Sequence, residues 1–322
     1  MPRISVVMPV YNGGSFLAPA VESVLGQTMS DLELIVVDDE SQDGSDATAG
    51  RYAARDQRVR LVRQEHAGVT VALNTGMELA RSPWIALHGS DDVSLPRRLE
   101  RQLEFLSANP DVAALGTWGW RMGSNGREIG VFDAGPLTRA ALDQLRRANE
   151  SIYLIATSVV LSRAVALGLG GFRTFAGAAE DIDLWTRMAD AHTILALPER
   201  LVRYRIHASS MSTTRFFQQM EDALRVRENA TRRRAGQTEL DCATFHARLA
   251  AQPLPRRLAR TLRWRSQHSY RVAGGLIADR RPAGLLWLAL SFALWPGLPA
   301  QRLKRQLLPW VRERAAGSVA PG

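Results

Sequence analysis

Carboxylate, amide and hydroxyl side chains cluster at several places in the first half of the chain, each directly after an apolar run. The clusters are Tyr11 with Asn12, Asp38 with Asp39, and Ser90 with Asp91 and Asp92. Hard carboxylate oxygens suit Mg²⁺ or Mn²⁺ as ligands. A further acidic cluster, residues 180–185 (EDIDLW), follows a glycine pair at 170–171. Side chains of these types could hold a charged ligand and accept a proton from it.

The apolar runs before these clusters have the length and composition of buried β-strands. They span residues 4–8, 32–37, 59–62 and 84–87, with helically spaced apolar residues between them. This alternation indicates an α/β fold, a doubly wound and mostly parallel sheet flanked by helices. Ligands bind at the carboxyl ends of such strands, so the three polar clusters should meet in one crevice. The sequence contains neither a glycine-rich dinucleotide-binding motif nor a P-loop motif.

The rest of the chain continues the mixed pattern before it becomes helical. Ser94 should cap a helix that carries Pro96 in its first turn and buries Leu99 and Leu103. Residues 112–129 should be rich in strand, and the cluster at 180–185 should open a helix. Beyond about residue 213 the sequence is helical and rich in arginine.

Six short segments, in order along the chain, are similar to the motifs of one enzyme family. They are residues 5–12 (SVVMPVYN), 36–45 (VVDDESQDGS), 68–80 (GVTVALNTGMELA), 90–96 (SDDVSLP), 180–185 (EDIDLW) and 204–207 (YRIH). The chain resembles the family 2 glycosyltransferases of the GT-A fold, in particular bacterial members that build surface polysaccharides. This resemblance implies a GT-A-like catalytic domain over residues 1–212, with a nucleotide-binding half (about 1–110) and an acceptor half (about 111–212). Residues 213–322 would form a helical, basic C-terminal extension.

The resemblance also implies roles for individual residues. The residues expected to bind the nucleotide sugar are Pro9, Tyr11, Asn12, Asp39, Asn74, Ser90 and Asp91. Asp91 and His207 are expected to ligate Mn²⁺ or Mg²⁺, which would stabilise the departing diphosphate. Glu180 and Trp185 are placed on the acceptor side.

Asp181 is predicted to be the general base of an inverting transfer. In a single in-line displacement, one carboxylate must take the proton of the attacking hydroxyl, which contributes about 10²–10⁴-fold in rate. Asp181 follows a glycine turn at the expected start of a helix, where helix-end amides favour the ionised carboxylate. The neighbouring Asp183 is expected to make a structural contact instead. The acceptor would be a saccharide or a lipid-linked saccharide.

Some features depart from the family pattern and leave other interpretations open. Gly89 stands where the family has the first Asp of its Asp-X-Asp motif, and Glu40 replaces a glycine. One alternative is therefore a catalytically weak or inactive module that binds nucleotide sugars, and a more distant one is a nucleotidyltransferase. The Asp38–Asp39 pair could merely end a strand and cap the next helix, and Trp185 could be a core residue.

The charge of the chain is concentrated near its C-terminus. The 41 Lys and Arg against 32 Asp and Glu give a formal charge of +9. Residues 251–322 hold twelve Arg and Lys304 but only Asp279 and Glu313, a net charge of +11, which leaves −2 for residues 1–250. This distribution argues against nucleic-acid binding by the main body. The single Cys242 excludes an internal disulfide.

The C-terminal extension also contains an apolar stretch, residues 283–295, bounded by Arg281 and Pro296. Thirteen such residues are too few to span a bilayer, which needs about 20. The stretch could lie on an anionic membrane surface with its arginines against lipid headgroups, or it could pack on the catalytic domain. No export signal is visible, so the protein is expected to be cytoplasmic. The basic residues 251–322 are expected to attach it to the inner face of the cytoplasmic membrane.

Overall fold

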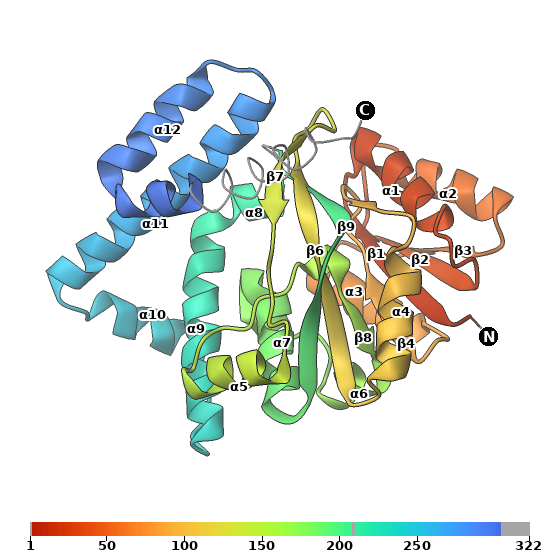
Figure 1. The fold of residues 1–322 in the computed structure, drawn as a ribbon, viewed down its shortest axis with the longest axis horizontal. Helices are drawn as coiled ribbons and strands as arrows, with labels where there is room; N and C mark the ends of the chain where they lie inside the picture. The colour runs from red at the N-terminus through yellow and green to blue at the C-terminus, as the bar shows by residue number, and fades with distance from the viewer. Residues whose placement is uncertain (1, 208–209, 304–322) are drawn as a thin grey trace, which may run out of the picture. The chain divides into compact units, whose positions relative to one another are not determined.

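The computed structural model describes residues 2–207 and 210–303, and its first third alternates strands with helices (Figure 1). These elements are β1 (Ile4–Val10), α1 (Leu17–Leu25), β2 (Leu32–Asp38), α2 (Ser45–Arg55), β3 (Val59–Arg63), α3 (Val69–Leu79) and β4 (Trp84–Leu87). All four strands predicted from apolar runs are confirmed. Strands β3, β2, β1 and β4 lie side by side in that order and run parallel, so their carboxyl ends share one edge.

The middle of the chain extends the sheet. Its elements are β5 (Val93–Ser94), α4 (Arg98–Ala108), β6 (Val112–Met122), β7 (Glu128–Phe132), α5 (Arg139–Arg147), β8 (Val160–Ser162), α6 (Arg163–Gly168), α7 (Glu180–Ala191) and β9 (Thr193–Arg205). The order is β3-β2-β1-β4-β8-β6-β9-β5, with β7 paired to β6. The strand β8 is antiparallel to both β4 and β6. The predicted α/β fold is confirmed, with parallel pairing in the β3-β2-β1-β4 part of the sheet.

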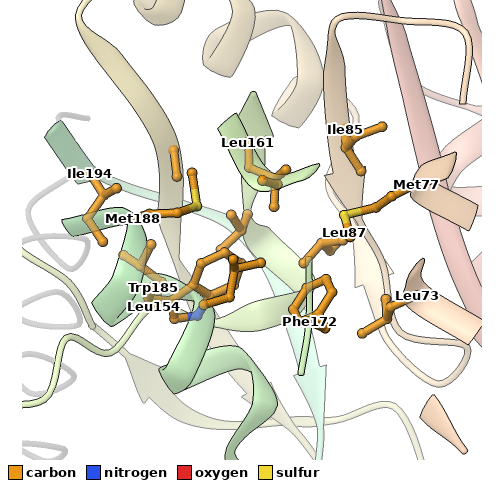
Figure 2. Packing of buried hydrophobic residues seen from close by; sticks show 14 of the residues in the cluster. Leu73, Met77, Ile85, Leu87, Leu154, Leu161, Phe172, Trp185, Met188 and Ile194 are labelled. Atoms are coloured by element: carbon orange, nitrogen blue, oxygen red, sulfur yellow. The ribbon is translucent and has the colours of Figure 1, made fainter. Parts of the chain in front are cut away.

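Both faces of the sheet are buried, as the continuous apolar strands predict. Along β1, Val7 points into one hydrophobic cluster, whereas Val6 and Met8 point into the other. Helices α1, α2 and α4 cover the second face, and α3, α5, α6 and α7 cover the first. Figure 2 shows the first cluster, where Phe172 and Trp185 lie between aliphatic side chains of α3, β4 and α7. Two covered faces explain why these strands carry no alternation of polar and apolar residues.

The prediction that Ser94 caps a helix is wrong. Ser94 lies in the short strand β5, which pairs antiparallel with β9, and α4 begins only at Arg98. The Ser94 hydroxyl accepts a hydrogen bond from the Arg98 guanidinium at 2.9 Å. The buried stripe of α4 is confirmed, since Leu99 and Leu103 are both almost fully buried.

The chain divides into two compact units that are not contiguous in sequence. The first unit comprises the residues up to Gly119, Asp133–Tyr204 and Asp222–Glu239. The second unit comprises Trp120–Phe132, Arg205–Glu221 and the chain from Leu240 onward. A functional boundary at residue 212 stays a prediction.

The helical C-terminal region is present in the described residues. It contains α8 (Met211–Thr214), α9 (Phe216–Arg234), α10 (Cys242–Ala250), α11 (Leu254–Ala278) and α12 (Ala283–Leu294). Helices α11 and α12 pack side by side as a hairpin (Figure 1), in which the Ser266 and Ser291 side chains are buried and hydrogen-bonded to each other. None of the helices in the described part of the chain is long and apolar enough to cross a membrane. Residues 304–322 of the predicted basic segment lie outside the described residues.

Candidate active site

The loops that follow β1 and β2 are hydrogen-bonded to each other. Asn12 adopts a left-handed conformation with φ of 51°, and its backbone N–H donates to the Ser41 hydroxyl at 2.9 Å. Its side-chain Oδ1 accepts from the backbone N–H of Gln42 at 2.8 Å. Pro9 lies in register with Val37 on the neighbouring strand. The parallel pairing therefore brings together residues that are almost 30 positions apart.

The Asp39 carboxylate, at the end of β2, accepts three hydrogen bonds. Its Oδ1 accepts hydrogen bonds from Gln64 Nε2 at 2.8 Å and from the backbone N–H of Ala67 at 2.9 Å. Its Oδ2 accepts from the backbone N–H of Gly68 at 2.9 Å and lies 2.9 Å from His66 Nδ1. Asp39 is only 2% exposed. This carboxylate holds the loop between β3 and α3 against the end of β2.

His66 is a residue of this site that the sequence patterns did not single out. Its ring lies against Tyr11 with centroids 4.3 Å apart and planes tilted by 32°. Both side chains are about half exposed. The signal that could have found His66 is its position in the loop after β3, the third of the parallel strands. The edge therefore presents an open aromatic surface beside a buried carboxylate.

The neighbouring Asp38 is also buried, and only one of its two carboxylate oxygens accepts a hydrogen bond. Oδ2 accepts a 3.3 Å hydrogen bond from the Ser41 backbone N–H. Oδ1 has no hydrogen-bond partner among the described residues. Because buried polar atoms are normally hydrogen-bonded, this oxygen has capacity for a water or a ligand hydroxyl.

The loop after β4 brings two carboxylates together around Gly89. A Cβ added to Gly89 would lie 3.0 Å from Asp91 Oδ1 and 2.6 Å from Asp92 Oδ2. The Gly89 backbone N–H donates to the Thr157 hydroxyl at 2.9 Å, and Ser90 and Asp91 form the turn. Because position 89 has no side chain, both carboxylates can lie against its backbone, where a Cβ would collide with Asp92 Oδ2.

This arrangement fits a divalent cation that also binds a substrate. Within residues 2–207 and 210–303, no group of three or more His, Cys, Asp and Glu side chains could hold a metal ion. Mg²⁺ in phosphate-transfer sites is commonly held by one or two carboxylates plus substrate phosphates. Asp91 and Asp92 supply two carboxylates of that kind, so the donor set fits a cation shared with a diphosphate.

Below this loop lies a fully buried cation, Arg98. Its guanidinium donates to Ser94 Oγ at 2.9 Å, to Gln102 Oε1 at 3.1 Å and to the Leu87 carbonyl at 3.0 Å. Burial lowers the pKa of Arg98 to about 9, and the nearby Asp92 carboxylate opposes that shift. At neutral pH the guanidinium therefore stays charged, and its charge interacts with the Asp92 carboxylate.

His88 lies between β4 and this loop and is also buried. Burial, and to a smaller extent the positive charge of Arg98, lowers the pKa of His88 to about 3. The His88 Nδ1 lies 2.7 Å from the Gly89 carbonyl. His88 is therefore neutral at physiological pH, and it helps to hold the backbone at Gly89.

Asp181 lies in the first turn of α7. Its Oδ1 accepts a 2.7 Å hydrogen bond from the Ile182 backbone N–H. Burial raises the pKa of Asp181 to about 6, against the opposing effect of backbone hydrogen bonds. The backbone amides at the start of the helix favour the ionised carboxylate, as expected, but desolvation has the larger effect on the pKa. A carboxylate with a pKa near the working pH is a better general base than one with an ordinary value.

The other residues of the acidic cluster pack inside the first unit. Asp183 forms ion pairs with Arg173 and, at 2.9 Å, with Arg187, which confirms its structural role. Glu180 is largely buried. Trp185 is fully buried against the edge of the Phe172 ring, with centroids 6.2 Å apart (Figure 2). Its contribution in this structure is to core packing, and the acceptor-side role of Glu180 and Trp185 stays a prediction.

Asn74 links α3 to the segment that leads into α7. Its Nδ2 donates to the Phe172 carbonyl at 2.8 Å, and its Oδ1 accepts from the Phe172 backbone N–H at 2.9 Å. Gly171 has a φ of +64°, and a Cβ there would lie 2.6 Å from Asn74 Oδ1. Both ends of the Asn74 amide are thus used within the protein, and its role toward a donor stays a prediction.

His207 belongs to the second unit, whereas all other predicted site residues belong to the first. The His207 carbonyl accepts hydrogen bonds from the backbone and side chain of Ser210. Its role as a metal ligand stays a prediction.

Comparison with known proteins finds relatives that are assigned as glycosyltransferases. EpsE of Bacillus subtilis, assigned as a glycosyltransferase, is 28% identical over 236 residues, which cover 70% of this chain and 81% of EpsE. TuaG of the same organism, assigned to teichuronic acid biosynthesis, is 28% identical over 218 residues, which cover 67% of this chain and 83% of TuaG.

Among solved structures, similarity of fold extends over nearly the whole chain. The mannosyltransferase PcManGT of Pyrobaculum calidifontis, in complex with GDP-Man and Mn²⁺, has a TM-score of 0.55 at 19% identity and covers 94% of this chain and 86% of its own. TarS residues 1–349 of S. aureus, in complex with UDP-GlcNAc, have a TM-score of 0.56 at 14% identity, with 95% and 93% covered. These two structures support the GT-A-like fold.

The sequence model of glycosyl transferase family 2 matches residues 5–165, half of the chain. The matched region contains the strands β1 to β4 with the loops that carry Tyr11, Asp39 and Asp91. This chain belongs to glycosyl transferase family 2.

Proposed function

We propose that this glycosyltransferase moves a sugar from a nucleotide-sugar donor to a saccharide or lipid-linked saccharide, with inversion, in the synthesis of a cell-surface polysaccharide. The observation that carries the proposal is that the Asp91 and Asp92 carboxylates both lie against Gly89, at the same sheet edge as Asp39 and Tyr11. That edge offers an aromatic surface for a nucleobase. The carboxylates after β4 could bind the diphosphate through a divalent cation. The relatives that act in polysaccharide synthesis support the same class of product.

In the proposed reaction, each group of the chain has one task. Tyr11 and the loop organised by Asp39 hold the nucleotide. Asp91 and Asp92 would hold Mn²⁺ or Mg²⁺ against the diphosphate, and such an ion supplies Lewis-acid stabilisation to the leaving group. Asp181 takes the proton of the acceptor hydroxyl while that oxygen attacks the anomeric carbon from the side opposite the leaving diphosphate. Because a single displacement occurs, the anomeric configuration inverts.

Thermal denaturation with a panel of nucleotide sugars tests the donor site. A donor present at about 100 times its dissociation constant should add about 2.7 kcal/mol to the free energy of unfolding. We expect UDP- or GDP-sugars to raise Tm in the presence of Mn²⁺, and Asp91→Asn to remove the Mn²⁺-dependent part of the rise. Asp143→Asn, which changes a carboxylate on α5 outside the site, is the matched control. No shift with any nucleotide sugar would contradict the proposal.

A second candidate function rests on Gly89. The lost carboxylate at that position would favour a module that binds nucleotide sugars without transferring the sugar. Donor hydrolysis or transfer, measured with Mn²⁺ as release of the free nucleoside diphosphate, distinguishes the two functions. Binding without any release of diphosphate favours the module.

We also propose that the helical hairpin of the second unit attaches the protein peripherally to an anionic membrane surface, the inner face of the cytoplasmic membrane. Helices α11 and α12 contain six arginines and no acidic residue. Leu285, Leu286 and Leu290 of α12 are 64%, 75% and 44% exposed. Exposed leucines beside arginines suit an interface with anionic lipid, to which each basic residue near the surface contributes about 1 kcal/mol.

Replacing two of these leucines tests the membrane proposal. The full chain should float with phosphatidylglycerol vesicles, and the pair Leu285→Glu and Leu286→Glu should lower the bound fraction more than tenfold. Burial of each leucine is worth about 1.5–3 kcal/mol. Leu137→Glu, at an exposed leucine of the first unit, should leave flotation unchanged. Equal flotation of the double variant, or no binding to anionic vesicles, would overturn the proposal.

A further inference from the structure

A cavity of about 310 Å³ lies in the second unit, between the start of α9 and the first half of α11. Two aromatic rings, two guanidinium groups, a carboxylate and a hydroxyl line it, from Phe217, Glu221, Arg260, Thr261, Trp264 and Arg265. This volume is at the lower end of the range for small-molecule sites, about 300–1,000 Å³. The cavity therefore suits a small polar ligand or the headgroup of a larger one.

The two aromatic rings of the cavity are held in place by other residues of the same unit. Phe217 packs against Phe216, with ring centroids 5.4 Å apart, and against His268, at 5.2 Å. It is nevertheless 43% exposed. Arg260 lies over the ring of Trp264, 5.6 Å from its centroid. The rings thus form a fixed apolar wall, and the faces of aromatic rings attract cations.

The charged side chains of the cavity have hydrogen-bonding capacity left for a ligand. Arg265 is exposed, and within the described residues it makes no hydrogen bond, ion pair or ring contact. Arg260 donates one hydrogen bond, to Gln252. Among the described residues, the Glu221 carboxylate forms one ion pair, in which its Oε2 lies 3.4 Å from His246 Nε2, so its Oε1 is available to a ligand.

This set of charges favours a ligand that carries both signs. Arginine binds phosphate through two parallel N–H groups, so Arg260 and Arg265 favour a phosphate. The Glu221 carboxylate lines the same cavity and disfavours a ligand that is only anionic. An ammonium group next to the phosphate would pair with Glu221 and lie beside the aromatic rings.

Exposed leucines lie beside this cavity along α11. Leu254, Leu258 and Leu262 are 63%, 53% and 39% exposed, and their spacing of four residues places them in one stripe, the leucine stripe. Thr261 and Arg265 each follow one of these leucines by three residues, so the leucine stripe and the cavity lie on the same side of the helix. An apolar stripe beside a site for a charged headgroup suits a phospholipid.

We propose that the cavity between α9 and α11 binds the headgroup of a zwitterionic phospholipid that carries a primary ammonium, the phosphatidylethanolamine class. Arg260 and Arg265 hold its phosphate, Glu221 accepts a hydrogen bond from its ammonium, and the leucine stripe contacts its acyl chains. Choline has no N–H to donate to the carboxylate, so a phosphatidylcholine headgroup binds less well. This inference rests on the proposed membrane attachment and specifies the lipid that is recognised.

Titration of the full-length protein with soluble headgroups tests the ligand chemistry without a membrane. In phosphorus NMR, glycerophosphoethanolamine should bind about tenfold more tightly than glycerophosphoglycerol, which lacks the ammonium, because a hydrogen bond to a charged group has about this effect. Inorganic phosphate should bind no more tightly than glycerophosphoglycerol. Equal affinities for the ethanolamine and glycerol compounds would overturn the proposal, and so would binding of neither.

Two variants identify the groups that recognise each end of the headgroup. Glu221→Gln should remove most of the preference for the ethanolamine compound, whereas Arg265→Gln should weaken both compounds alike, because both carry the phosphate. Because the preference is a ratio of two affinities, partial unfolding of a variant does not change it. Glu128→Gln and Arg263→Gln remove the same charges from exposed positions of the second unit outside the cavity and should leave the preference unchanged. An undiminished preference in Glu221→Gln would overturn the role of the carboxylate.

Flotation with mixed vesicles tests whether the ligand is a lipid. At a fixed fraction of phosphatidylglycerol, replacing phosphatidylcholine by phosphatidylethanolamine should raise the bound fraction of the wild-type protein severalfold, and Glu221→Gln should abolish this increase. If the soluble headgroup bound but phosphatidylethanolamine had no effect on flotation, the assignment to a lipid would be wrong. Flotation with phosphatidylglycerol without binding of either soluble headgroup would overturn this inference and leave the proposed membrane attachment supported. Absence of flotation with every vesicle would contradict the membrane attachment itself.

Discussion

Asp181→Asn should lower kcat by about 10²–10⁴-fold, the range expected for loss of a general base. The substitution preserves the shape of the side chain and replaces the carboxylate by an amide that cannot take the acceptor proton. Donor binding should be unchanged, because the role proposed for Asp181 concerns the acceptor hydroxyl only. Steady-state transfer assays together with nucleotide titrations measure both quantities.

The raised pKa of Asp181 adds two signatures to this prediction. Because the base must be ionised in the free enzyme, wild-type kcat/KM should fall about tenfold per pH unit below pH 6. The folded protein also binds this proton more tightly than the unfolded chain, so ionisation of Asp181 above pH 6 destabilises the fold. Asp181→Asn should therefore be more stable than wild type at pH 7, on the order of 1–2 kcal/mol. This gain should disappear as the pH falls to about 4.

The matched control for this experiment is Asp143→Asn, which should leave both the rate and the pH profile unchanged. Loss of transfer accompanied by a higher Tm would rule out unfolding as the cause. Transfer by Asp181→Asn at the wild-type rate would remove Asp181 from the role of base.

Arg98→Met should lower the free energy of unfolding by about 3–5 kcal/mol, the range seen when a buried charge that stabilises an opposite buried charge is removed. The guanidinium is fully buried, and its positive charge interacts favourably with the buried Asp92 carboxylate. Its loss also removes the donors to Ser94, Gln102 and the Leu87 carbonyl. Methionine fills much of the volume but replaces none of these interactions.

Chemical denaturation of three variants tests this explanation. Arg97→Met removes the neighbouring, exposed guanidinium, which pairs with Glu100 on the surface, and should change stability by less than about 1 kcal/mol. Combining Arg98→Met with Asp92→Asn should recover part of the loss, because the buried negative charge is removed as well. If the single and double variants were equally unstable, the lost hydrogen bonds alone would account for the effect. If Arg97→Met and Arg98→Met lowered the free energy of unfolding by the same amount, the burial of Arg98 would not contribute to stability.

The positions of the parallel strands and of most of the site loops could be predicted from the sequence. The strand Trp84–Leu87 has the predicted bounds, and the other three differ by at most two residues at their ends. Continuous apolar runs are a local signal, because a strand buried on both faces needs apolar residues at every position. The grouping of Asn12, Asp39 and Asp91 at one edge followed from the same signal, since parallel strands place their carboxyl ends together.

The roles of individual side chains were decided by contacts between distant parts of the chain. Asp39 and Asp181 look alike in the sequence as acidic residues beside apolar runs. The loop after β3 donates three hydrogen bonds to the Asp39 carboxylate, whereas partial burial raises the pKa of the Asp181 carboxyl. Ser94 resembled a helix cap until the pairing of β5 with β9 placed it in a strand.

By itself the sequence determined the fold class, the family and the sheet edge at which we propose the active site, because periodicity and short motifs are local properties of the chain. Only the tertiary structure decided that His66 stacks on Tyr11 and that Arg98 lies beneath the Asp91–Asp92 loop. It also decided that Trp185 belongs to the core. Burial and hydrogen-bond partners depend on residues far away in the sequence, and these two quantities set the charge and the freedom of each side chain.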